Sequence, residues 1–250
     1  MVPRRNRRAR REVLRCERHA PDGGWHRYTA TFTPSETGNK NTLRLSFPAE
    51  GRVWIDYVSL FPRDTYKGRT NGLRKDVATM IEELRPAFVR WPGGCIVEGL
   101  TLDNRVKWKE TIGDPIKRPG EYNLWGYRST YGFGYHEFLQ FCEDIGAEGM
   151  FVCNAGMSCL FRNGDYVQGD ELEPLIEEAL DAIEYALGDA KTTKWGAERA
   201  RNGHPEPFPL KYIEVGNENV FARYAANYNR FHKAIKAKYP QLTIISALMF

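Results

Sequence analysis

The sequence lacks the features that would place it in a specialised class of protein. Its apolar runs fall short of the roughly eighteen residues that cross a membrane, and its N-terminus has no apolar stretch of the kind that a secretory signal requires. Its five cysteines are an odd number without CxxC spacing, which argues against a zinc or redox motif. We therefore expect no membrane partner, no metal and no cofactor, and assign no cellular compartment.

Positive charge is concentrated at the N-terminus. Residues 1–18 carry eight arginines against Glu12 and Glu17, a net charge of +6, whereas the remaining residues carry −2. Such a basic run can bind nucleic acid with strong salt dependence, but a nucleic-acid-binding domain would also carry basic residues on its folded surface. We therefore interpret residues 1–24 as a leader that is disordered or foreign to the native protein, and expect no nucleic-acid partner.

Residues 25–61 show the two-residue alternation of β-strands. Apolar side chains alternate with polar ones in three stretches, which the turn-forming sequences PSETGNKN and PAEG separate. Three strands bury too little surface to form a stable sandwich by themselves. We predict that residues 25–62 are the last strands of a β-sandwich module, followed by a linker at residues 63–72.

From residue 73 onward, helical periods alternate with short apolar runs. The runs at 87–91, 149–154, 211–215 and 242–250 predict strands, and the stretches at 73–84, 135–145, 171–187 and 221–237 predict helices. Strands that alternate with helices indicate βαβ units and a parallel sheet. We predict an α/β fold in which residues 73–250 form a partial (β/α)8 TIM barrel with about four of its eight units. A doubly wound sheet is the alternative, although no GxGxxG turn follows the first strand.

A carboxylate stands where the strand KYIEVGNEN, residues 211–219, should end. Catalytic side chains of α/β barrels lie at such strand ends, but Asn217 and Glu218 could equally turn the chain into the next helix. The long 92–134 segment is rich in Trp and Tyr, which suit a sugar-binding loop or simply pack it. These patterns leave both interpretations open.

Six stretches between residue 71 and residue 219 resemble the α-L-arabinofuranosidases of glycoside hydrolase family 51. They are NGLRKDV (71–77), FVRWPGGCIVEG (88–99), RVKWKETIGD (105–114), RPGEYNLWGY (118–127), GYHEFLQFCEDIGAE (134–148) and GHPEPFPLKYIEVGNEN (203–219). In the branch that is most similar, a carbohydrate-binding-like β-sandwich is inserted after the first barrel strand. VWIDYVSLFP (53–62) resembles the last strand of that module.

The resemblance implies roles where residues match the family motifs. The GNE triplet implies that Glu218 is the general acid/base and that Asn217 hydrogen-bonds the 2-hydroxyl group of the sugar. Arg90, in RWPGG, matches the basic residue beneath the arabinose subsite. Other branches have a sugar-contacting Asn where this sequence has Cys95, so a direct role for Cys95 in substrate binding stays open.

The implied activity is the release of terminal non-reducing α-L-arabinofuranosyl residues by double displacement, which needs two carboxylates about 5–5.5 Å apart. We expect partial burial and a neighbouring charge to hold the proton of Glu218. The family nucleophile lies on a strand that follows Phe250, Glu98 matches no nucleophile, and Glu214 should lie about 13 Å down the strand. We therefore expect this chain to be a fragment without turnover of its own.

Two rival functions remain compatible with the motifs. A xylosidase or endoglucanase on the same barrel would share the Asn-Glu pair, and a non-catalytic remnant could hold a carbohydrate without turnover. The resemblance implies an arabinose-containing oligosaccharide or polysaccharide as partner, and relatives are often oligomeric or exported. The polymer, the oligomeric state and the compartment are not assigned from this sequence.

Overall fold

A computed structural model describes residues 24–34, 38, 42–47, 50–70 and 72–248. The chain divides into two units, Met1–Ile55 and Asp56–Phe250. The predicted leader lies outside the described residues, apart from Gly24. No helix of the described residues is both long enough and apolar enough to span a bilayer.

The predicted strands between residues 25 and 62 are not confirmed. The described residues of this range are not assigned to any strand, and their large apolar side chains are exposed, with 74% of Trp25 and 73% of Trp54 accessible. A strand with one apolar face is stable only when that face packs against a second layer. The prediction that residues 25–62 are the last strands of a β-sandwich module therefore stays a prediction.

The second unit is built on a parallel sheet, as predicted. Its strands are β1 (Phe88–Trp91), β4 (Glu148–Cys153), β5 (Leu210–Asn219) and β6 (Thr243–Leu248), in the order β1-β4-β5-β6. Each neighbouring pair is parallel. Strands that follow one another in the chain are therefore neighbours in the sheet, as in part of a barrel, whereas a doubly wound sheet reverses its order.

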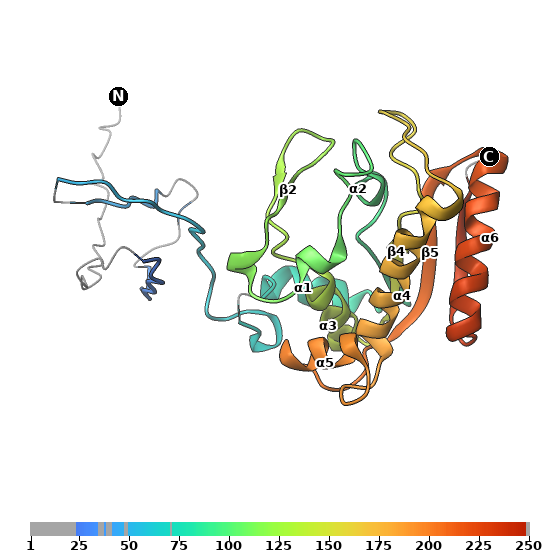
Figure 1. The fold of residues 1–250 in the computed structure, drawn as a ribbon. Helices are drawn as coiled ribbons and strands as arrows, with labels where there is room; N and C mark the ends of the chain where they lie inside the picture. Colours follow the sequence, from blue (N-terminus) through green and yellow to red (C-terminus); the bar gives the residue numbers. More distant parts are fainter. Residues whose placement is uncertain (1–23, 35–37, 39–41, 48–49, 71, 249–250) are drawn as a thin grey trace, which may run out of the picture. The chain divides into compact units, whose positions relative to one another are not determined.

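Helices connect the strands and cover the sheet (Figure 1). They are α1 (Lys75–Glu83), α2 (Cys95–Glu98), α3 (Tyr135–Ile145), α4 (Glu173–Leu187), α5 (Lys194–Arg201) and α6 (Phe221–Lys238). Short 3-10 turns occur at Tyr66–Gly68, Trp108–Thr111, Pro115–Lys117 and Gly169–Leu172. The four predicted helices are present, and α3 has the predicted bounds. The short α2 and α5 were not predicted, because their sequences CIVE and KWGAERAR show no extended apolar stripe.

The aromatic loop between β1 and α3 divides into a buried part and an exposed part. Trp108 is buried, and its Nε1 donates to the backbone oxygen of Glu178 at 2.9 Å. In contrast, Trp125 and Tyr127 are exposed and stacked with ring centroids 6.5 Å apart. They lie in the turn between β2 (Glu121–Tyr122) and β3 (Arg128–Ser129), which pair as a short hairpin. The packing interpretation therefore holds for Trp108, while the hairpin rings remain available to a ligand.

Candidate functional site

Polar side chains from two strands, one short helix and one loop meet at one edge of the sheet. Arg90 is on β1, Cys95 and Glu98 are on α2, Cys159 follows β4, and Glu214, Asn217, Glu218 and Asn219 are on β5. The carboxyl ends of parallel strands lie at the same edge, so side chains that are distant in sequence come together there.

The end of β5 is an irregular strand rather than a smooth one. Its register with β6 shifts between Val215 and Asn219, Gly216 has φ +81° and Glu218 has φ +45°. A Cβ at Gly216 would lie 1.9 Å from Oδ1 of Asn219, and that Oδ1 accepts a hydrogen bond from the backbone N–H of Asn217 at 3.1 Å. The bulge exposes Glu218 while Asn217 and Asn219 stay buried.

An ion pair lies beneath this bulge. Nε and Nη2 of Arg90 donate to the carboxylate of Glu214 at 2.5 and 2.7 Å, and this pairing raises the pKa of Arg90. Nη2 of Arg90 also donates to Oδ1 of Asn217 at 3.0 Å. A guanidinium has only donors to offer, so the carbonyl oxygen of Asn217 faces Arg90 and its amide nitrogen faces the other way.

The amide nitrogen of Asn217 faces two carboxylates. It lies 3.3 Å from Oε2 of Glu98 and 3.4 Å from Oε2 of Glu218. The other oxygen of Glu98 accepts from Nδ2 of Asn219 at 3.2 Å. Glu98 is only 2% exposed, and burial, assisted by the charge of Glu218, raises its pKa from 4.5 to about 7. The pKa of Glu98 thus lies near neutrality, and both of its oxygens have amide partners.

The thiol of Cys95 lies against the predicted acid/base. Its Sγ is 3.5 Å from Oε2 of Glu218 and 4.0 Å from Nδ2 of Asn217. Burial raises the pKa of Cys95 to about 12, so the group beside Glu218 is a neutral thiol. Its position next to Asn217 follows from Gly94, because a Cβ there would come within 3.2 Å of Oδ1 of Asn217.

The structure brings the four residues singled out in the sequence, Arg90, Cys95, Asn217 and Glu218, into one connected group. The expected partial burial of Glu218 is wrong, because the bulge turns this side chain outward and leaves it exposed. Glu214, which the spacing along the strand set apart from Glu218, joins the group through Arg90.

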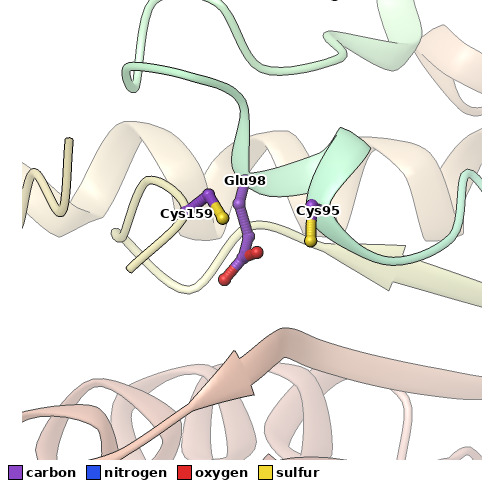
Figure 2. A group of neighbouring side chains, drawn as sticks. All are labelled: Cys95, Glu98 and Cys159. Atoms are coloured by element: carbon purple, nitrogen blue, oxygen red, sulfur yellow. The ribbon is translucent and has the colours of Figure 1, made fainter. Parts of the chain in front are cut away.

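Sequence reasoning did not assign Glu98 and Cys159 to the site. Ligand atoms of Cys95, Glu98 and Cys159 lie within 4.8 Å of one another (Figure 2), although no CxxC spacing predicts a metal site. The signal for Glu98 is its i,i+3 spacing from Cys95, which places both on one face of α2. Cys159 belongs to a loop more than sixty residues away in the chain, so no local pattern marks it.

Comparison with known proteins gives a consistent set of relatives. A family model described as the alpha-L-arabinofuranosidase 1 domain matches residues 80–250. Alpha-L-arabinofuranosidase 2 of Arabidopsis thaliana is 43% identical over 224 residues, which are 89% of this chain and 32% of that protein. The extracellular exo-alpha-L-arabinofuranosidase of Streptomyces chartreusis is 42% identical over 239 residues, 91% of this chain and 29% of that protein. The chain thus spans about a third of the length of these curated relatives.

Solved structures give the same result. An arabinose-bound α-L-arabinofuranosidase of glycoside hydrolase family 51 is 41% identical with a TM-score of 0.69, and the match covers 73% of this chain and 29% of that one. The arabinose complex of the α-L-arabinofuranosidase from Thermotoga maritima is 28% identical with a TM-score of 0.57 and coverage of 70% and 34%.

Proposed function

This chain belongs to the α-L-arabinofuranosidases of glycoside hydrolase family 51, and we propose that it supplies the acid/base side of a retaining active site. The enzyme releases terminal non-reducing α-L-arabinofuranosyl residues from arabinose-containing oligosaccharides or polysaccharides. The observation that carries the proposal is the convergence of Arg90, Asn217 and Glu218 at the carboxyl edge of the sheet. Two arabinose-bound relatives support the sugar class.

Glu218 is the general acid and then the general base. A retaining glycosidase first protonates the leaving oxygen and later activates water with the same carboxyl group. Both steps need a carboxyl group that reaches the substrate, and the exposed side chain of Glu218 at the end of β5 meets that need. Its Oε2 lies 3.5 Å from the thiol of Cys95 and 3.4 Å from the amide nitrogen of Asn217.

Arg90 and Glu214 act on the sugar through Asn217. Their ion pair fixes the Asn217 amide from below, so a hydroxyl group of the sugar that reaches Asn217 would meet an oriented donor. Cys95 lies beside the same position and would line the sugar pocket with a small neutral group.

The nucleophile is a separate residue from the carboxylates assembled here. Both oxygens of Glu214 are paired with Arg90, and both oxygens of Glu98 accept from asparagine amides. A nucleophilic carboxylate must be ionised when it attacks the anomeric carbon, whereas burial raises the pKa of Glu98 to about 7 and the charge of Glu214 is held in its ion pair with Arg90. The chain covers about a third of its curated relatives, and we place the nucleophile in the part of such an enzyme that this sequence does not include.

The test replaces Glu218 by Ala in an enzyme that contains this segment together with its nucleophile. Natural arabinosides have poor leaving groups that need protonation, so their hydrolysis should fall by about 10²–10⁴-fold. Nitrophenyl arabinofuranosides have a good leaving group, so their glycosylation step should change far less. The matched control is Glu83→Ala, which removes an exposed glutamate at the end of α1 and should leave both rates unchanged.

Equal losses on the two substrates, or no loss, would remove Glu218 from the acid/base role. A panel of nitrophenyl glycosides on the same enzyme tests the sugar specificity. Faster hydrolysis of the xyloside or glucoside than of the arabinofuranoside would replace the proposed substrate by that of the rival glycosidases.

A further inference from the structure

We propose that Cys95, Glu98 and Cys159 form a binding site for a soft divalent metal ion of the Zn²⁺ type, directly beside Glu218. Two thiol sulfurs and one carboxylate oxygen lie within 4.8 Å of one another. Figure 2 shows the side chain of Glu98 between those of the two cysteines. Thiolate and carboxylate are both established ligands of Zn²⁺.

The spacing of these atoms fits a tetrahedral ion. With Zn–S bonds of about 2.3 Å, two sulfur ligands of a tetrahedral site lie about 3.8 Å apart. The observed limit of 4.8 Å therefore requires only small rotations of the side chains.

The backbone holds the three ligands in place. Cys95 and Glu98 are the first and last residues of α2, so their i,i+3 spacing puts both on one face of a single turn. The backbone N–H of Cys159 donates to the oxygen of Gly99, directly after this turn, at 3.1 Å. The carbonyl of Cys159 accepts from the N–H of Arg162 at 2.9 Å and from the N–H of Gly164 at 3.2 Å.

The amides of Asn217 and Asn219 hold the carboxylate of Glu98 in position, as hydrogen-bond partners commonly do for metal ligands. Asn217 and Asn219 donate to the two oxygens of Glu98 at 3.3 and 3.2 Å, and such partners fix a ligating carboxylate. Cys159 and Glu98 are buried while Cys95 is partly exposed. An ion can therefore enter from the side of Cys95, where Oε2 of Glu218 lies 3.5 Å from the sulfur.

This location predicts inhibition of the enzyme by Zn²⁺, and that consequence rests on the proposed function. Three protein ligands leave a fourth tetrahedral position open, and the carboxylate of Glu218 is close enough to Cys95 to fill it. A carboxylate bound to the ion can no longer give its proton to a leaving oxygen. The metal site itself does not depend on catalysis.

The binding test uses Co²⁺ as a spectroscopic probe for the 250-residue chain under a non-thiol reductant. Cys16, which lies outside the described residues, is replaced by Ser throughout to remove its thiol. We expect one equivalent of Co²⁺ to produce a thiolate-to-cobalt charge-transfer band, which Zn²⁺ then removes by displacement. Cys159→Ser should weaken binding by more than about 100-fold, because it deletes a ligand, and Asn219→Ala by about 10–100-fold, because it deletes a partner of a ligand.

The control variant is Cys142→Ser, which removes a different buried thiol, on α3, and should keep the band. Absence of the band in the parent chain, its persistence in Cys159→Ser, or its equal loss in Cys142→Ser would overturn the site. If Cys159→Ser fails to fold, Glu98→Gln decides in its place, since loss of a carboxylate ligand should also weaken binding. Cobalt binding without inhibition by Zn²⁺ would contradict the link to Glu218, whereas an active acid/base without a cobalt band would contradict only the metal site.

Discussion

The ion pair beneath the site gives the sharpest prediction about stability. Arg90→Met keeps the aliphatic stem but removes the guanidinium, so the carboxylate of Glu214, whose side chain is 11% exposed, loses its partner. Breaking a buried pair by removing one member costs about 3–5 kcal/mol. Because the side chain of Arg90 is 32% exposed, water can partly replace it, and we expect a loss near the lower limit, about 3 kcal/mol.

The assay is urea unfolding followed by tryptophan fluorescence. With a denaturant dependence of about 2 kcal/mol per M, a loss of about 3 kcal/mol lowers the midpoint by about 1.5 M. The matched variant Glu214→Gln and the double variant complete a thermodynamic cycle. Once both charges are gone no buried charge is unpaired, so the double variant should lose less than the sum of the single losses by about 2 kcal/mol. Additivity within about 0.5 kcal/mol would refute this account of the pair.

Two further predictions concern pH and the strand end. Burial lowers the pKa of His136 from 6.5 to about 4, so the unfolded chain takes up this proton first as the pH falls. Unfolding free energy should therefore decrease by up to about 3 kcal/mol between pH 6.5 and 4, and an unchanged pH profile in His136→Asn would contradict this. Gly216→Ala places a Cβ 1.9 Å from Oδ1 of Asn219 at a φ of +81°, whereas Gly146→Ala, at φ +70°, meets open space. Gly216→Ala should lower the free energy of unfolding by at least about 2 kcal/mol more than Gly146→Ala, as measured by thermal unfolding. Equal losses in the two variants would contradict the steric argument.

The strands of the sheet and the helices that pack against them could be predicted from apolar periodicity, because the residues that are apolar in the pattern are the ones that the fold buries. Helix α3 begins and ends where its pattern does, β1 and β6 fall within the predicted runs, and β4 is shifted from its run by one residue. Strand β5 is present too, but it continues past the predicted run 211–215 to Asn219. Helix α5 was not predicted because its stability depends on tertiary contacts. Its Arg199 is fully buried and donates from Nη1 to the backbone oxygen of Tyr185 at 2.8 Å, an arrangement that no window of sequence reveals.

The strands predicted from the alternating stretches before residue 62 are not confirmed. Their period is that of strands, yet the described residues of this range stay outside any strand and expose their apolar side chains. A helix can satisfy its backbone within one segment, whereas a strand depends on partners that the sequence of that strand does not specify.

The candidate site was predictable to the extent that it lies at strand ends. Glu218 and Asn217 follow an apolar strand, and Arg90 lies within another, so their meeting follows from parallel topology. The bulge that exposes Glu218 was not predicted, since it depends on the side chain of Asn219 folding back to the N–H of Asn217. Cys159 was not predicted for the same reason: its contacts are made across the fold.

Asn217 explains why these features belong to one site. Arg90 offers only donors and the carboxylates of Glu98 and Glu218 accept, so the Asn217 amide can satisfy them in one orientation alone. The ion pair with Glu214 thereby determines that a nitrogen, not an oxygen, faces Glu218. Both N–H groups of this amide face carboxylates, so under the proposed function a hydroxyl group of the sugar accepts the hydrogen bond that otherwise goes to Glu218. The ion pair between Arg90 and Glu214 therefore also sets which atom of Asn217 faces the sugar.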